Sequence, residues 1–108
     1  MIAMEPSLVI RHGELMIDMS RYHVQLGEIP LLLSYREYAL LVYLATHTGH
    51  VVTKRRLLEE GLGRHDPGGL RMVDERIRHL KSVLERAGGQ FIEEVSGEGY
   101  RFVPQERG

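Results

Sequence analysis

Residues 70–89 read LRMVDERIRHLKSVLERAGG, and this stretch decides the fold. Its apolar side chains recur every three or four residues and therefore share one helix face, at Val73, Ile77, Leu80 and Leu84. A narrow stripe of this kind is typical of a helix that packs on a core. Two consecutive glycines, Gly88 and Gly89, mark its end. The pattern predicts a helix over residues 70–86 with one buried face.

Two shorter helices are predicted before this stretch. In SYRE, Ser34 stands three residues before Glu37, which is the spacing of a capping box, and leucines follow at the spacing of one helix face. The segment HTG ends this first helix, with Gly49 expected at the C′ position. A second helix is expected to start after Thr53 as its N-cap and to end at Gly61.

Both ends of the chain have the short period of β-strands. Residues 8–33 hold three or four short apolar runs with turn residues about every eight positions, which predicts an antiparallel meander. Near the C-terminus, FIEEV and YRFV flank SGEG, whose glycines Gly97 and Gly99 allow a tight hairpin turn. Residues 61–69, with four glycines and a proline, form a loop. The predicted fold class is α+β, with an N-terminal antiparallel sheet, three helices and a C-terminal hairpin.

Composition indicates one globular domain. The chain has 108 residues, of which 43% are hydrophobic and 27% charged, and it has no cysteine, which excludes disulfides and thiolate metal sites. We expect the domain over residues 8–104, a flexible segment at 1–7 and a tail at 105–108. The longest apolar run, residues 39–45, is too short for a membrane span, and no secretory signal is visible. A cytoplasmic location and no membrane partner are therefore expected.

The outward face of the long helix is mixed in charge. Residues 70–86 hold five Lys or Arg against three acids. Opposite the apolar stripe lie Glu75, Ser82 and Arg86, with Arg71 and Arg78 on one flank and Met72 and His79 on the other. A helix of this width fits the DNA major groove, but a solvated face with i, i+4 ion pairs explains the same residues. The basic start of the second helix, Lys54, Arg55 and Arg56, likewise faces either solvent or a phosphate.

The order of the predicted elements and the residues themselves together resemble one known family. The resemblance rests on LSYREYALLVYLATHTGHVVTKRRLLEEGLG (33–63), VDERIRHLKSVLE (73–85) and VSGEGYRFV (95–103) in that order, and it covers about residues 8–104. The family is the DNA-binding effector domain of two-component response regulators of the OmpR/PhoB type, a winged helix-turn-helix. The resemblance implies double-stranded DNA as partner, with the third helix in the major groove and the hairpin as a wing. It also implies that loop 61–69 meets RNA polymerase, and that the domain is monomeric in solution and pairs in tandem on DNA.

The resemblance also places candidate DNA contacts along the chain. Arg71, Arg78, His79 and Lys81 match positions where the family uses basic residues on DNA. Arg76 and Tyr100 match phosphate-contacting positions, and Arg101 follows the last wing glycine as in family members. Asp74 matches a structural position, as partner of a nearby basic side chain. The full set of expected DNA-binding residues is Arg71, Glu75, Arg76, Arg78, His79, Lys81, Lys54, Arg55, Tyr100 and Arg101.

Three residues depart from the family pattern. Ser96 stands where an arginine often precedes the first wing glycine, and Leu62 stands where a tryptophan is frequent. Glu75 occupies a position of the third helix where small or apolar residues are common, although a glutamate accepts well from cytosine N4. With Ser96 and Glu98 at its tip, the wing is a poor probe of the minor groove. We therefore expect the third helix to provide most of the binding.

The sequence gives little support for a metal site or for an enzyme. His47, His50 and His65 lack the additional ligands that a zinc site needs, so no metal or cofactor is expected. The sequence shows neither a nucleophile elbow nor a phosphate-binding loop, so we expect no enzyme. The remaining alternative is a winged helix that binds a protein with weak or no DNA binding. Its support is the net charge of −1 and the acidic residues Glu75, Glu93, Glu94 and Glu98.

Overall fold

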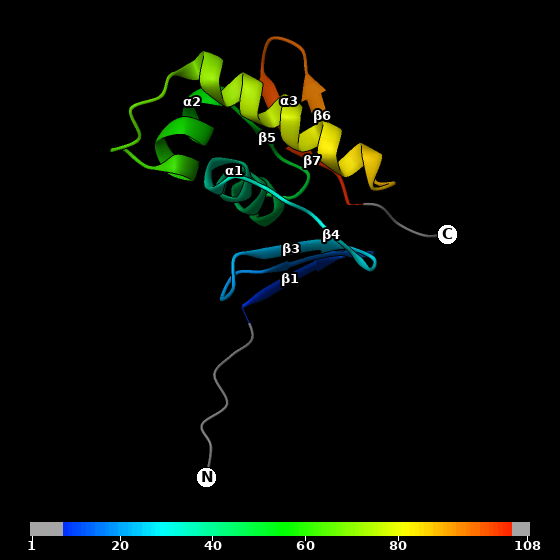
Figure 1. Cartoon of the computed structure of the whole chain (residues 1–108). Helices are drawn as coiled ribbons and strands as arrows, with labels where there is room; N and C mark the ends of the chain where they lie inside the picture. The colour runs from blue at the N-terminus through cyan, green and yellow to red at the C-terminus, as the bar shows by residue number, and fades with distance from the viewer. Residues whose placement is uncertain (1–7, 105–108) are drawn as a thin grey trace.

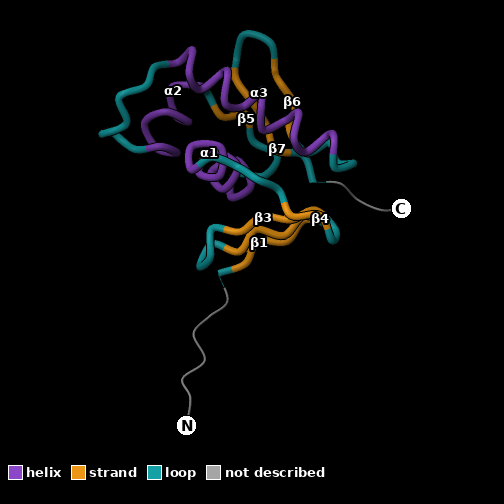
Figure 2. The backbone as a smooth tube through the Cα atoms, viewed as in Figure 1, coloured by secondary structure: helices purple, strands orange, loops and turns teal. Residues whose placement is uncertain are grey.

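The computed structural model describes residues 8–104, which form two small antiparallel sheets around three helices. Figure 1 shows the N-terminal sheet on one side of α1, with α3 and the C-terminal hairpin on the other. Strands β1 to β4 lie together below α1, whereas β5, β6 and β7 lie at the level of α3 (Figure 2). The predicted α+β order of sheet, helices and hairpin is confirmed. The expected flexible segment 1–7 and tail 105–108 lie outside the described residues.

The first sheet has the strand order β1-β2-β3-β4 and comprises β1 (Val9–His12), β2 (Leu15–Asp18), β3 (His23–Leu26) and β4 (Ile29–Pro30). Leu15 pairs with Leu26 and Ile17 with Val24, and all four side chains are buried. This alternation turns one face of the sheet toward the core. The fourth predicted strand is short, because after Pro30 only the bond from the Leu31 N–H to the Val24 carbonyl continues the ladder.

The first helix, α1 (Tyr35–Thr46), begins at the predicted capping box. The Glu37 N–H donates to Ser34 Oγ at 3.2 Å, and the Ser34 N–H donates to Glu37 Oε1 at 3.0 Å. The expected position of Gly49 is corrected: the C-cap is His47, so the C′ residue is Thr48. Gly49, with φ of 82°, follows one residue later and donates its N–H to the Phe102 carbonyl. The glycine therefore turns the chain into the next strand.

The second helical segment differs from its prediction. Thr53 is the N-cap of α2 (Lys54–Arg56), as expected, but the helix then widens into a π-helical segment, η1 (Leu57–Leu62). Its i→i+5 spacing brings Leu62 onto the same core as the fully buried Leu57. The helical region therefore ends at Leu62 and not at Gly61, and the irregular loop before α3 spans residues 63–69.

The third helix, α3 (Leu70–Arg86), has the predicted buried face. Its four buried residues are Val73, Ile77, Leu80 and Leu84. They pack on α1, whose Leu40, Leu41 and Leu44 are fully buried. The helix ends at Ala87 as C-cap, followed by Gly88 with φ of 101°, so the glycine stop signal is confirmed. None of the helices within residues 8–104 has the length and apolar character needed to span a membrane.

The C-terminal hairpin is part of a three-stranded sheet. Strand β7 (Gly99–Phe102) lies between β6 (Ile92–Val95) and β5 (Val51–Val52), a short strand that the sequence did not indicate. Gly99, with φ of 152°, lies so close to β5 that an added Cβ would overlap the Val52 carbonyl. The glycine therefore allows the hairpin to pack on β5, and the pairing fixes the base of the wing.

Candidate nucleic-acid interface

The outer face of α3 is polar and exposed to solvent. Arg71, Glu75 and Arg78 are exposed on it, and the Arg78 side chain retains 67% of its accessible surface. Arg86 is also exposed on this face, and His79 is exposed on the flank nearer α1, where it contacts Glu37. Figure 1 shows that the β6–β7 turn extends past α3, so the helix and the wing tip project on the same side of the domain. This arrangement presents a helix and a loop to one partner.

A cluster around Asp74 joins three elements behind this face. Its carboxylate accepts a hydrogen bond from the Tyr100 hydroxyl of β7 and forms ion pairs with Lys54 at 3.2 Å and Arg78 at 3.6 Å. The Tyr100 hydrogen bond, together with the Lys54 and Arg78 charges, lowers the pKa of Asp74 despite its partial burial. Burial and the adjacent carboxylate raise the pKa of Tyr100, so its hydroxyl remains a donor. The expected role of Asp74 as partner of a basic side chain is confirmed.

Tyr100 lies inside the domain, contrary to the expectation that it contacts a phosphate. The residue is only 1% exposed, and its hydroxyl is engaged by Asp74. Alternation along β7 explains this, because Tyr100 and Phe102 point into the core while Arg101 points outward. Tyr100 therefore connects the wing to α3 from inside and has no surface to offer DNA.

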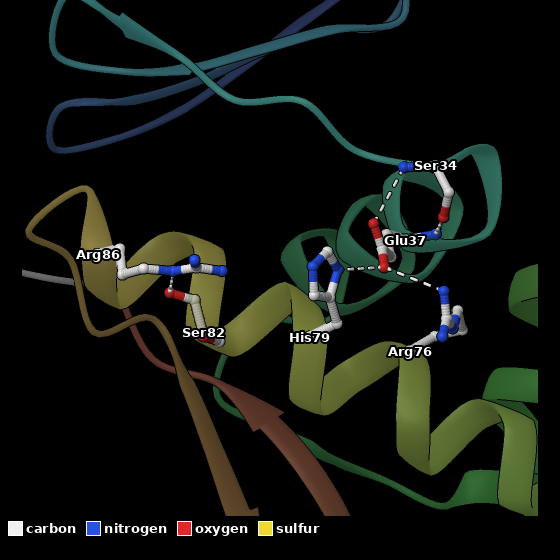
Figure 3. A network of polar contacts seen from close by, with 6 residues as sticks. All are labelled: Ser34, Glu37, Arg76, His79, Ser82 and Arg86. Carbon is white, nitrogen blue, oxygen red and sulfur yellow. Dashed lines mark hydrogen bonds and ion pairs between the residues drawn. The ribbon is translucent and has the colours of Figure 1, made fainter.

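A second cluster joins α3 to the start of α1 (Figure 3). Glu37 Oε2 lies 2.6 Å from His79 Nδ1 and 3.5 Å from Arg76 Nη1, while Glu37 Oε1 accepts the Ser34 N–H. Burial acts to raise the pKa of Glu37, but the hydrogen bonds from Ser34 and His79 outweigh it and leave the pKa lowered. Glu37 is therefore an ionised carboxylate that orients two of the expected DNA-binding residues.

The basic start of α2 is partly neutralised by its own helix. Arg55 pairs with Glu59 at 3.5 Å, and Arg56 pairs with Glu60 at 3.5 Å. A hollow of about 270 Å³ separates this helix start from the wing, lined on one side by Lys54 and Arg55 and on the other by acidic wing residues. The side chains that line it from the wing include Glu94 and Glu98. The hollow is thus mixed in charge and not uniformly basic.

The wing tip carries an acidic residue at its centre. Ser96, Gly97 and Glu98 are exposed, and Arg101 forms an ion pair with Glu93 across the hairpin. Lys81 lies on the flank of α3 that faces β6, where it lines a hollow together with Glu85, Glu93 and Glu94. Lys81 and Arg101 are therefore turned toward the hairpin and its acids, away from the middle of the α3 face.

The structure thus separates the expected site residues that share the outer face of α3 from those that lie inside the domain or toward the hairpin. It brings Arg71, Glu75, Arg78 and His79 together on one face, with Lys54 and Arg55 at its edge. Sequence reasoning missed the role of Glu37, which it interpreted only as part of a capping box. Its contact with His79 spans 42 residues, and no local pattern signals a contact of that range. Arg86 was assigned to the outward face but left out of the expected contacts, although it is exposed there.

Histidines do not gather into a metal centre in the part of the chain that the structure describes. No group of three or more His, Asp, Glu or Cys suitable for a metal occurs within residues 8–104. His47 instead stacks on Tyr43 with ring centroids 4.1 Å apart, and its Nδ1 lies 2.7 Å from the Tyr43 carbonyl oxygen. His65 is exposed in the 63–69 loop.

Comparison with known proteins identifies relatives over most of the chain. Residues 28–102 match the family described as "Transcriptional regulatory protein, C terminal". The phosphate regulon transcriptional regulatory protein PhoB of Klebsiella pneumoniae is 35% identical over 95 residues, covering 87% of this chain and 42% of PhoB. The two-component response regulator PhoP of Pseudomonas aeruginosa is 32% identical over 99 residues, 91% of this chain and 44% of PhoP. This chain thus spans less than half the length of these relatives.

A solved relative has the same architecture. The RstA DNA-binding domain of Klebsiella pneumoniae, crystallised with the RstA box, superimposes with a TM-score of 0.77 at 32% identity, covering 91% of this chain and 99% of that domain. The family match includes the three helices and the whole hairpin sheet, whereas strands β1 to β3 lie before it. The chain therefore belongs to the OmpR/PhoB-type family of winged-helix effector domains found at the C-terminus of transcriptional regulatory proteins.

Proposed function

We propose that this chain is the sequence-specific double-stranded DNA-binding part of a transcriptional regulator. The observation that carries the proposal is the likeness, over nearly the whole domain, to the RstA domain crystallised with its DNA box. The family consists of transcription regulators and not of enzymes. Regulation of transcription in response to a signal requires the longer protein that the relatives have, and it is proposed here by analogy with them.

In the proposed complex α3 lies in the major groove. Its 17 residues give a rod about 25 Å long, which is enough to cross the groove with its outer face toward the bases. Arg71 and Arg78 have the charge and reach for guanine edges or phosphates, while Glu75 between them suits a cytosine amino group. One acid among the arginines favours base sequences that place a cytosine opposite it, because its desolvated carboxylate lacks a donor wherever that cytosine is missing.

The two flanks of α3 are proposed to position the helix. Lys54 and Arg55 lie at the start of α2, beside the hollow that separates it from the wing, and we propose that they contact the DNA backbone beside the groove. Phosphate contacts of this kind fix register without reading sequence. The acidic wing tip contributes little attraction, so α3 provides most of the affinity and the wing mainly holds α3 in place.

The test starts from a random pool of DNA duplexes, from which bound sequences are selected and then measured by fluorescence anisotropy. The selected duplex should bind more tightly than a scrambled one, and Arg78→Ala should weaken it by about 1–3 kcal/mol if this arginine contacts a base. Lys54→Ala should weaken all duplexes alike. Arg21→Ala is the matched control, because its side chain is 81% exposed on the remote N-terminal sheet.

One result would favour the alternative of a protein-binding module. If no duplex is enriched and the chain shows no affinity at low salt, the α3 face does not bind DNA. Equal and negligible effects of Arg78→Ala and Lys54→Ala on a duplex that does bind would point to a different face.

Three further assignments belong to the same proposal. Loop 63–69 is proposed to meet RNA polymerase; it is anchored by the two hydrogen bonds of Arg36 to Asp66, at 3.1 and 2.9 Å. The chain is proposed to be monomeric in solution and to pair in tandem on DNA. Sedimentation that shows a tight dimer without DNA would contradict this. Because it binds genomic DNA, a regulator of this kind acts in the bacterial cytoplasm, where we place the chain.

A further inference from the structure

Glu37 is the one buried charged residue within residues 8–104, and it lies directly behind the proposed DNA-binding face. It is 2% exposed, whereas the side chain of its partner His79 retains 50% of its accessible surface. One end of the imidazole is therefore held inside the protein and the other is open. Figure 3 shows the second ring nitrogen turned away from the carboxylate and from Arg76.

The carboxylate decides which ring nitrogen carries the proton. An ionised carboxylate only accepts hydrogen bonds, so the 2.6 Å contact requires a proton on His79 Nδ1. In the neutral ring Nε2 then bears a lone pair, which repels an anion. In the protonated ring Nε2 also carries a proton and becomes a charged donor. Protonation of His79 therefore reverses the character of the atom that the helix presents outward.

The surroundings of His79 contain few other charges. On α3, Arg76 shares the Glu37 carboxylate at 3.5 Å, and Glu75 is exposed one turn before His79. Arg86, two turns after His79, donates to the Ser82 carbonyl. On α1, Arg36 is engaged by Asp66. Lys54 of α2 pairs with Asp74, and η1 contributes Glu59 and Glu60, paired with the α2 arginines. Glu37 is the carboxylate that contacts the ring.

We propose that His79 binds DNA as an imidazolium whose Nε2–H donates to a backbone phosphate, and that Glu37 is the positioning residue that holds the ring for this contact. The inference rests on the proposed DNA-binding function. A phosphate next to Nε2 adds negative charge beside a ring that already touches a carboxylate, so the bound ring holds a proton more firmly than the free ring does. DNA affinity then increases as the pH falls through the titration of the imidazole.

The sign and size of the effect follow from linkage. The complex binds more protons than the free protein, so the logarithm of the association constant decreases as pH rises, by no more than about one decade per pH unit for one imidazole. Between about pH 8 and pH 6 the expected gain is about five- to thirtyfold.

The test measures the dissociation constant of the full chain for its selected duplex between about pH 6 and pH 8 at fixed ionic strength. His79→Gln removes the titrating group and should remove most of the pH dependence. His50→Gln is the matched control: His50 is exposed before β5, at the base of the hairpin sheet opposite the wing turn, and its variant should keep the dependence. Circular dichroism confirms that each variant is folded.

Glu37→Gln separates positioning from a merely structural role. The amide can donate to Nδ1, which moves the ring proton to Nε2, so the neutral ring already presents a donor. The pH dependence should then flatten while binding near pH 8 is retained, whereas a structural role would weaken binding equally at every pH. If Glu37→Gln fails to fold, His79→Gln decides the matter alone.

The outcomes distinguish this inference from the proposed function. If the unchanged protein binds no duplex at any pH, the proposed function fails, and the His79 contact fails with it. If it binds but His79→Gln shows the same pH dependence as the unchanged protein, DNA binding stands and the role of His79 is overturned. If the unchanged protein tightens on acidification and only His79→Gln and Glu37→Gln lose the effect, both stand.

Discussion

Replacing Gly99 with alanine should destabilise the fold much more than replacing Gly97, although both glycines belong to the same hairpin. Gly97 has φ of 77° and no atom within 4 Å of an added Cβ. At Gly99 the added Cβ would overlap the Val52 carbonyl oxygen, with the Val52 carbonyl carbon at 2.8 Å and Thr53 Cα at 3.0 Å. These neighbours are backbone atoms and cannot swing aside as a side chain can.

The expected magnitudes follow from these two settings. The left-handed conformation costs alanine about 1–2 kcal/mol at Gly97, partly offset by the lower entropy of the unfolded alanine chain. At Gly99 the backbone strain of about 1–3 kcal/mol is joined by loss of β5 pairing, because Val52 must move away from β7. With ladder bonds at about 0.5–1.5 kcal/mol each, Gly99→Ala should cost about 3–5 kcal/mol in total.

Urea denaturation followed by circular dichroism measures both free energies of unfolding. The stabilisation that comes from the lower entropy of the unfolded chain is common to the two variants and cancels in their difference, which should be about 2–4 kcal/mol. Equal losses for Gly97→Ala and Gly99→Ala would refute the reasoning, because they would show that β5 does not lie against the hairpin as described.

Three further predictions concern side chains on or directly behind the proposed interface. Tyr100→Phe should cost about 1–3 kcal/mol in urea denaturation, since Asp74 loses a buried donor but keeps Lys54; no change would mean that the pair contributes nothing. The lowered pKa values of Asp74 and Glu37 imply stability that is present above their unfolded values and lost as pH falls below about 4. Acid titration of Asp74→Asn should therefore show a shallower decline than the unchanged protein. Ser96→Arg should tighten DNA binding in anisotropy, and no gain would mean that the wing tip stays away from DNA.

Much of the fold could be predicted because its signals are local. The α3 stripe depends on residues three or four positions apart, and the capping box of Ser34 and Glu37 lies within a single turn. Glycine stops and hairpin turns are similarly short in range. Each of these patterns has a physical cause within a few residues. The stripe, the capping box, the Gly88 stop and the hairpin appear as expected, whereas the expected stops at Gly49 and Gly61 are each displaced by one residue.

The features that were missed depend on contacts between distant segments. Strand β5 has only two residues, too few for a period, and it exists because β7 pairs with it. The π-helical turn at Leu57–Leu62 adapts the helix to a core formed elsewhere. Tyr100 was assigned to DNA by its position in a motif, but strand alternation and Asp74 place it inside the domain.

In the candidate site, the positions of side chains around α3 were predictable, as the local features of the fold were. Helical rotation correctly placed Arg71 and Arg78 on one flank of the outer face and His79 on the other, since this depends only on spacing along α3. The ion pairs that decide how much charge is free for a partner were not predictable. Arg55 with Glu59 follows helical spacing, whereas Lys54 with Asp74 and Arg76 with Glu37 require the packed fold.

Salt dependence of binding to the selected duplex tests the central claim most directly. If α3 and the start of α2 neutralise about four to six phosphates, the logarithm of the association constant should fall against the logarithm of salt concentration with a slope of about −4 to −5. A scrambled duplex should show a similar slope at lower affinity. Binding that is absent, or that stays constant from low to physiological salt, would contradict the account of this chain as a DNA-binding domain.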